Sequence, residues 1–156
     1  MSQAKSDNTT RARAVRALPA SVNKTQRNLL PVPLDPNELP EIYGMMISGD
    51  CLLPEIEDGA VMKFSKSEPY KPGDFVLVYR RPELVKPGAL PGMLKRLVVA
   101  PPPWVTFPYR ENPKSELRAL LIAEQLNPRA QFAIPCADLV AVHKCLGRCE
   151  PDEMAR

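Results

Sequence analysis

The sequence predicts a single small domain that is mostly β-structure and follows a disordered N-terminal tail. Its 156 residues are enough for one compact domain, and 44% of them are hydrophobic, which supports a core. Nineteen prolines against seven glycines disfavour long helices, because proline removes a backbone donor. From residue 41 onwards, short apolar runs alternate with turn sequences. We therefore expect a tail at 1–30, one domain at 31–150 and a short C-terminal tail at 151–156.

The predicted N-terminal tail is polar and basic. It holds six lysines and arginines against Asp7, a net charge of +5, so the rest of the chain carries −2 of the total of +3. A slightly acidic domain is not expected to bind nucleic acid directly, because nucleic-acid surfaces are strongly basic. We interpret the tail as a solvated arm, and contact with nucleic acid or an acidic membrane, or a mitochondrial transit peptide, stays open for it.

The domain itself is predicted to consist of short strands joined by proline-containing loops. Residues 28–40 hold four prolines and should lie extended over the domain, and 81–92 should form a long, stiff loop. Residues 75–81 are the clearest strand, since they are rich in β-branched and aromatic side chains. The predicted strands are 41–47, 60–64, 75–81, 93–100, 104–107 and 138–147.

The segment 114–126 is ambiguous. Its helix formers, with a potential cap at Ser115 and apolar residues at Leu117 and Leu120, favour a helix locally. The fold indicated by the motifs below requires a strand here, followed by a loop at 126–128. We predict the strand, because tertiary context can override local propensity.

The four cysteines are predicted to be reduced thiols, since the sequence shows no secretory signal. Cys145 and Cys149 lie four residues apart with only His143 nearby, which is a weak pattern for zinc. No apolar run approaches the roughly 20 residues that span a bilayer. We expect a soluble, cytoplasmic protein that has no metal site, no cofactor and no membrane partner.

Two residues carry candidate chemistry, Cys51 and Lys95. Cys51 follows Gly49 and Asp50 in a polar turn, where backbone N–H groups can stabilise an oxyanion. In an extended strand Lys95 shares its face with apolar side chains, which is costly for a charged amine. Burial lowers the pKa of a lysine, and a neutral amine can accept the proton of a thiol. The simpler alternative is that Lys95 reaches solvent from an edge strand and Cys51 is a packing residue.

The order of the motifs resembles the peptidase domain of the LexA-type family, which includes LexA, UmuD and the C-terminal domains of phage repressors. The motifs are "SGDC" at 48–51, "DG" at 58–59, "GD" at 73–74, "LKRL" at 94–97 and "NP" at 127–128, before a final strand. The resemblance covers about residues 41–147. It implies strongly curved β-sheets of the β-clip type, a fold that the family shares with signal peptidases.

The resemblance also implies roles for individual residues. Cys51 falls on the nucleophile, which is normally serine, Lys95 on the general base, and Gly49 and Asp50 on the turn before the nucleophile. The framework positions matched are Pro54, Asp58, Gly59, Gly73 and Asp74. By the same resemblance we expect a homodimer, an extended peptide as substrate, and a setting in the SOS response or in a phage repressor system.

The sequence departs from the family pattern at several points. Besides Cys51, Leu52 stands where methionine is usual and Ala60 stands where the family has aspartate. The DNA-binding domain of the repressors is not found, and no Ala–Gly or Cys–Gly bond occurs, so self-cleavage of the familiar kind is not expected.

Three functions stay open at this point. The first is a peptide hydrolase with a Cys51/Lys95 dyad, either weakly active or inactive. The second is a non-catalytic, dimerising regulatory module of the same fold, and the third is a small β domain with another role. A chymotrypsin-like hydrolase is disfavoured because the single histidine, His143, falls on the predicted last strand. A membrane signal peptidase is disfavoured because the sequence shows no anchor segment.

Overall fold

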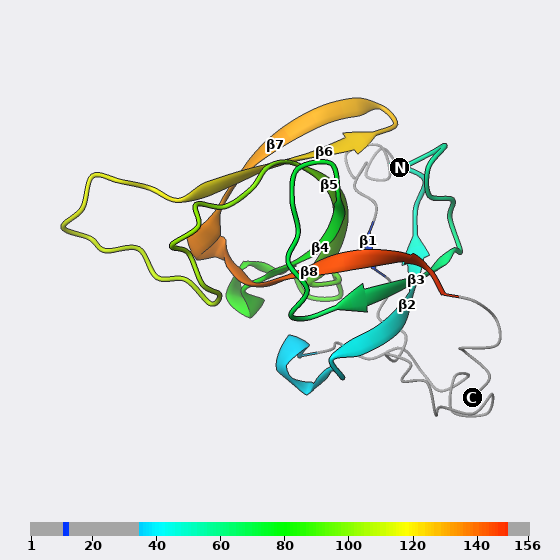
Figure 1. Ribbon diagram of the computed structural model, residues 1–156, viewed down its shortest axis with the longest axis horizontal. Coiled ribbons are helices and arrows are strands. Elements are labelled where there is room, and N and C mark those ends of the chain that lie inside the picture. Colours follow the sequence, from blue (N-terminus) through cyan, green and yellow to red (C-terminus); the bar gives the residue numbers. More distant parts are fainter. Residues whose placement is uncertain (1–10, 13–34, 150–156) are drawn as a thin grey trace.

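The computed structural model describes residues 11–12 and 35–149, and within them it shows antiparallel strands and three short 3-10 helices (Figure 1). The strands are β1 (Arg11–Ala12), β2 (Ile42–Ser48), β3 (Val61–Ser65), β4 (Phe75–Arg80), β5 (Gly92–Val99), β6 (Leu120–Leu126), β7 (Arg129–Pro135) and β8 (Leu139–Arg148). The 3-10 helices are η1 (Pro36–Glu38), η2 (Pro82–Leu84) and η3 (Cys136–Asp138). The predicted mostly-β class is confirmed.

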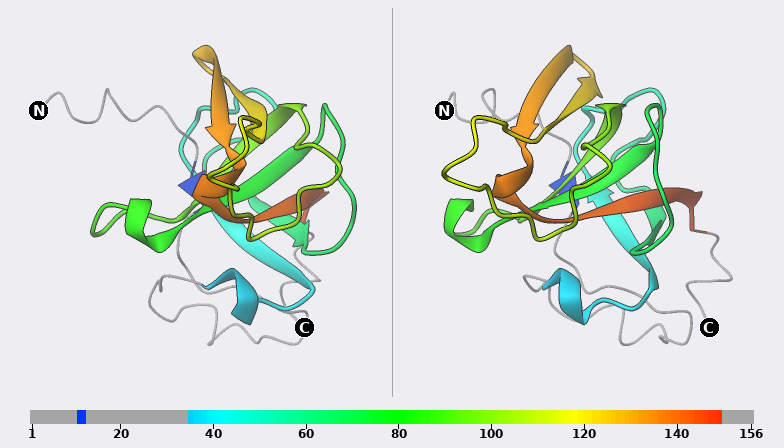
Figure 2. Two further views of the ribbon diagram at one scale, coloured as in Figure 1. Left: turned by 90° about the vertical axis from the view of Figure 1, so that its left-hand side faces the viewer. Right: turned by 60° about the vertical axis from the view of Figure 1, so that its left-hand side comes forward.

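The strands form one sheet that closes on itself. Their order is β1-β2-β3-β8-β4-β5-β6-β7, and β1 also pairs with β5, which joins β1, β2, β3, β8, β4 and β5 into a ring. Strands β6 and β7 continue from β5 as a hairpin at one side of the ring (Figure 1). Figure 2 shows this hairpin projecting away from the other strands.

Along one edge, β5 changes partner and β8 loses its partner. On one edge of β5, Met93 pairs with β1, whereas Arg96–Val99 pair with β6. On one edge of β8, residues 144–148 pair with β3, whereas the preceding residues of β8 do not. The other edges of β5 and β8 both pair with β4.

The core consists of two apolar clusters on the two faces of the sheet. Successive residues of a strand point to opposite faces, so Val76 and Leu77 of β4 belong to different clusters. The first cluster contains Tyr43, Phe64 and Leu77 among others, and the second contains Val76 and Leu121 among others.

Most predicted strands match observed ones. Predicted strands 41–47, 60–64, 75–81, 93–100 and 138–147 correspond to β2, β3, β4, β5 and β8. The ambiguous segment contains strand β6 and no helix, as predicted. Strand β7 is not among the predicted strands, because its mostly exposed residues show no sustained alternation of apolar and polar side chains.

Two local predictions are wrong. Residues 104–107 form no strand, because the prolines at 101–103 and at 108 remove the donors that a ladder partner would need. Residues 28–40 were expected to lack regular structure, yet η1 forms at Pro36–Glu38, where the Asp35 side chain accepts a hydrogen bond from the Asn37 N–H.

The predicted tails lie mostly outside the described residues. Within 1–30, only Arg11 and Ala12 are described, and their backbone forms strand β1 rather than a disordered tail. The C-terminal tail at 151–156 and the other residues of 1–30 are not described.

Candidate functional site

The turn that holds Cys51 is part of the loop that connects β2 to β3. Ile47 and the residues at 59–60 close its base, since the Ile47 N–H donates to the Ala60 carbonyl and the Gly59 N–H donates to the Ile47 carbonyl, each at 2.8 Å. Gly49 begins the turn with a φ of 106°, a conformation that favours glycine. Its N–H donates to Asp58 Oδ1 at 2.7 Å, so the framework aspartate fixes the start of the turn.

Cys51 is buried, and its backbone is tied to the end of β6. Its side chain and backbone together are only 3% exposed. The Cys51 carbonyl accepts hydrogen bonds from the N–H groups of Leu126 and Asn127, at 2.7 and 2.8 Å. The Asn127 side-chain amide also donates to the Asp50 carbonyl at 3.3 Å. The turn around Cys51 is therefore held against the turn that joins β6 to β7.

Lys95 lies in the interior, at 2% exposure, so the alternative in which it reaches solvent is wrong. Its Nζ donates to Gln125 Oε1 at 3.3 Å, and the Gln125 Nε2 donates to the Pro128 carbonyl at 2.9 Å. The second bond fixes the amide so that its oxygen faces the amine. The Phe132 ring lies on β7 with its centroid 4.9 Å from Lys95 Nζ, close enough for a cation–π contact.

The structure places the two predicted site residues against the same three-residue segment. Lys95 binds Gln125 through its side chain, and Cys51 binds Leu126 and Asn127 through its carbonyl. A buried cysteine, through its backbone, and a buried lysine, through its amine, thus both contact the end of β6. This arrangement has the components of a nucleophile and a base, because an amine in a dry site can take a proton from a thiol.

The backbone of β1 passes along this site. Arg11 pairs with Ser48 at the end of β2, three residues before Cys51, and also with Met93 of β5, two residues before Lys95. Strand β1 therefore bridges the two strands that carry the site residues. Between β2 and β5, strand β1 pairs with a neighbour on each side.

One residue of the predicted oxyanion turn already uses its backbone N–H within the fold. The Gly49 N–H is already engaged by Asp58, so it cannot also stabilise an oxyanion. Asp50 begins a tight turn in which its carbonyl accepts from the Leu53 N–H at 3.2 Å. The N–H of Asp50 itself forms no hydrogen bond to another described residue, so it is the better candidate donor of the two.

Sequence reasoning missed two contributors to this site, Gln125 and Phe132. It named Asn127 only as part of the "NP" motif at 127–128, which marks a turn. Nothing in the sequence relates this turn to Lys95, because the contact depends on how β5 pairs with β6.

His143 lies on the last strand, as predicted, and is buried away from the candidate site. Its Nδ1 and the Tyr43 hydroxyl share a 2.6 Å hydrogen bond. Burial, together with the nearby positive charge of Lys66, lowers the pKa of His143 to about 4. His143 is therefore a neutral member of the core at physiological pH.

The other features that the sequence singled out are the remaining cysteines and the possible metal ligands. Within the described residues, no group of three or more His, Cys, Asp or Glu side chains could hold a metal ion. Burial raises the pKa of the Cys145 thiol and raises that of Cys136 to about 11. In the same part of the chain, no helix has the length and apolar character needed to cross a membrane.

Comparison of the chain with family models, with curated proteins and with solved structures found no match. The fold and the site together define a mostly-β protein in which a buried cysteine and a buried lysine contact the same short segment beside strand β1.

Proposed function

We propose that the chain is a peptide hydrolase of the LexA-type fold in which Cys51 is the nucleophile and Lys95 is the general base. The observation that carries the proposal is the convergence of both residues on residues 125–127, with a backbone strand running alongside. The closed, curved sheet supports the LexA-like fold, because the family is built from strongly curved sheets.

The proposed reaction uses both residues twice. Neutral Lys95 accepts the Cys51 proton, and the thiolate attacks the carbonyl carbon of a peptide bond. The C–N bond then breaks, and the Lys95 ammonium returns its proton to the leaving amine. Water hydrolyses the resulting thioester, with Lys95 again taking a proton, and the thiol is regenerated.

The proposed substrate is an extended peptide that lies between β2 and β5. Strand β1 already pairs with both strands through Arg11, so an external peptide has to displace β1 or bind as β1 does. Main-chain pairing of this kind gives affinity, while side-chain contacts give specificity.

A second candidate is a non-catalytic, dimerising regulatory module of the same fold. The burial of the site favours it, since Cys51 is 3% and Lys95 is 2% exposed. In addition, the Lys95 amine already binds Gln125. In this case Cys51 is a small residue that fills the position of the family's serine.

Thiol alkylation distinguishes the two candidates. Iodoacetamide labelling over a range of pH, with each cysteine resolved by mass spectrometry, should show Cys51 reacting at lower pH than Cys136, whose thiol pKa is raised to about 11 by burial. In Lys95→Ala the Cys51 titration should move to higher pH. A Cys51 that titrates like an ordinary thiol, and does so equally in Lys95→Ala, contradicts the hydrolase and favours the regulatory module.

Peptide cleavage provides the direct test. A synthetic peptide with the sequence of residues 3–18, followed by mass spectrometry, represents the segment that contains β1. Cleavage should occur with the native chain, persist at a reduced rate in Cys51→Ser and be lost in Cys51→Ala. Equal cleavage by Cys51→Ala would show that another residue or a contaminant is responsible.

A further inference from the structure

One edge of strand β8 has no partner strand in the described part of the chain. Strand β3 pairs with β8 only as far as the Ser65–Lys144 pair, and residues 141–143 continue to pair with β4 on the other edge alone. No backbone hydrogen bond from the described loops reaches residues 140–143. Alternate residues of a strand direct their N–H and C=O groups to each side, so this edge presents unpaired polar groups.

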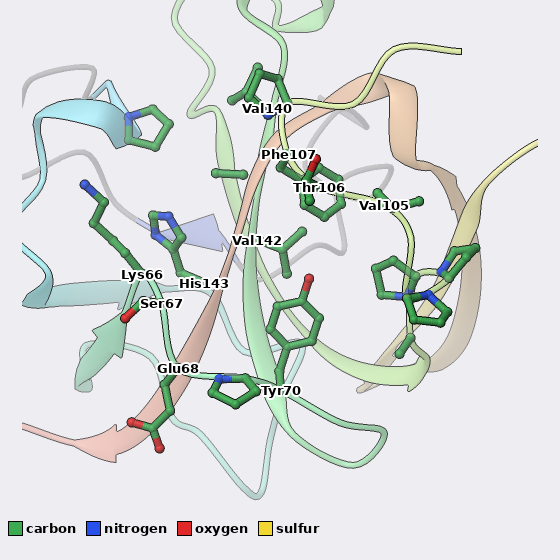
Figure 3. A pocket seen from close by; sticks show the side chains of 18 of the residues that line it. Lys66, Ser67, Glu68, Tyr70, Val105, Thr106, Phe107, Val140, Val142 and His143 are labelled. Atoms are coloured by element: carbon green, nitrogen blue, oxygen red, sulfur yellow. The ribbon is translucent and has the colours of Figure 1, made fainter. Parts of the chain in front are cut away.

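A cavity of about 650 Å³ runs along this edge. Its lining includes the four consecutive residues Val140–His143. Because successive side chains of a strand alternate between faces, four consecutive residues line one cavity only when it lies along the strand's edge. Figure 3 shows the side chains of Val142 and His143 on opposite sides of β8, as expected for a cavity that lies along the edge of the strand.

The walls of the cavity combine apolar and polar surface. On one side, residues 66–70 follow the end of β3, and on the other, the proline-rich residues 100–108 pass across the opening. Tyr70 and Phe107 pack against the second core cluster and stand beside Val142 (Figure 3). The space beside β8 therefore suits apolar side chains on an extended backbone.

The charges around the cavity are already partnered. Lys144 Nζ lies 3.7 Å from Glu68 Oε1 and 3.8 Å from Asp74 Oδ2. Lys66 Nζ donates to the Leu39 carbonyl at 3.0 Å, and burial keeps His143 neutral. The charged residues that line the cavity, Lys66 and Glu68, are of opposite sign, so the cavity offers a ligand no net charge, which suits an uncharged segment.

We propose that this cavity binds an extended, uncharged segment of a partner protein, which adds a strand to β8 in line with β3. The main-chain groups of residues 140–143 would pair with the segment, and its apolar side chains would contact Tyr70 and Phe107. This function is independent of the proposed hydrolase, since Cys51 and Lys95 do not line the cavity.

A designed peptide provides the probe. The full-length chain is titrated into fluorescein-labelled acetyl-Thr-Val-Thr-Val-Thr-Val-amide, and binding is followed by fluorescence anisotropy. We expect saturable one-to-one binding and slower hydrogen exchange at the amides of residues 140–143, with no change in β7, which provides another sheet edge. The same peptide with alternate amides N-methylated should bind at least about tenfold more weakly, because it cannot pair with the edge.

A matched pair of variants tests the location. Thr106 is exposed and lines the cavity, so Thr106→Trp should fill it and weaken peptide binding at least about tenfold. Glu116 is also exposed but lies outside the cavity, so Glu116→Trp should bind as the native chain does. Thermal unfolding of both variants verifies that they fold.

Four results would each overturn the proposal. These are failure to bind at millimolar peptide, binding that tolerates N-methylation, protection of β7 instead of β8, and exchange at residues 140–143 that is already slow in the free chain. In the last case, sedimentation separates a dimer, in which a second copy covers the edge, from a monomer that covers it with its own chain.

Discussion

Lys95 and His143 are both buried bases on strands that flank β4, yet they lie on opposite faces of the sheet. Lys95 is opposite Val76 and His143 is opposite Leu77, and successive residues of β4 face different core clusters. The sheet therefore carries one nitrogen base in each of its two cores.

The side chains and strands that surround the two bases differ. His143 is enclosed by the rings of Tyr43 and Tyr79, with centroids 5.7 and 5.4 Å away. Lys95 instead lies on β5 between Met93, which pairs with β1, and Arg96, which pairs with β6, and the Phe132 ring of β7 lies over its amine. His143 packs inside an aromatic cluster and so belongs to the core. Lys95 lies near strand β1, whose place a bound peptide would take if the proposed function is correct.

The largest effect is expected for removal of the Lys95 amine. Lys95→Met keeps an unbranched side chain of similar length, so the fold should retain its stability while the proposed base is lost. Cleavage of the 3–18 peptide should fall by at least about 100-fold, as expected for loss of a general base. Peptide cleavage and urea unfolding measure the two properties separately.

The other buried base, His143, provides the control for the Lys95→Met variant. His143→Gln should leave cleavage within about twofold of the native rate, because His143 lies on the other face of the sheet. If both substitutions reduce cleavage to the same degree, the loss reflects a general disturbance of the sheet.

The second effect concerns the pH dependence of stability. The pKa of His143 is lowered by burial from 6.5 to about 4. As pH falls below 6.5, the unfolded chain therefore binds a proton that the folded chain does not. The contribution of His143 is fully present above its unfolded pKa and is lost as pH falls towards the folded one. Between about pH 7.5 and about pH 4.5, the loss should be about 2 to 3 kcal/mol.

Urea unfolding of the native chain and of His143→Gln at both pH values measures this loss. The carboxylates titrate in both proteins, so the difference between their pH dependences isolates His143. Equal pH dependences would mean that His143 titrates normally and that its enclosure by the two tyrosines has no effect on its proton affinity.

The sequence predicted the strands of the ring better than the site's surroundings. Strands β2, β4 and β5 could be predicted from the sequence, because β-branched, aromatic and other apolar side chains form short runs between turn residues. Local pattern placed Cys51 in a turn and Lys95 on an apolar strand face, but it left open whether Lys95 reaches solvent, and only the structure shows that Lys95 is buried.

The contacts around Lys95 could not be predicted in the same way. Gln125 and Phe132 reach Lys95 only because β6 pairs with β5 and β7 pairs with β6 in one particular register. Register is set by the packing of the whole sheet, and a shift by one residue would turn both side chains away. Segment 114–126 even favoured a helix locally, so its partners were not deducible from the sequence.

The smallest effect is expected for Phe132, which covers the Lys95 amine. Phe132 is 36% exposed, and its ring centroid lies 4.9 Å from Lys95 Nζ. Phe132→Leu removes the aromatic face but keeps an apolar side chain. A double-mutant cycle with Lys95→Met, followed by urea unfolding at neutral pH, should give a coupling energy of about 0.5 to 1 kcal/mol.

The sign of this coupling bears on the comparison between the two bases. A cation–π contact stabilises the charged amine, so a favourable coupling means that Phe132 stabilises the ammonium that forms when Lys95 takes the Cys51 proton. The Phe132→Leu chain should then alkylate Cys51 more slowly than the native chain at neutral pH, because the thiolate and its ammonium partner lose this contact. A coupling energy of zero would mean that Phe132 only covers Lys95, as the two tyrosines enclose His143.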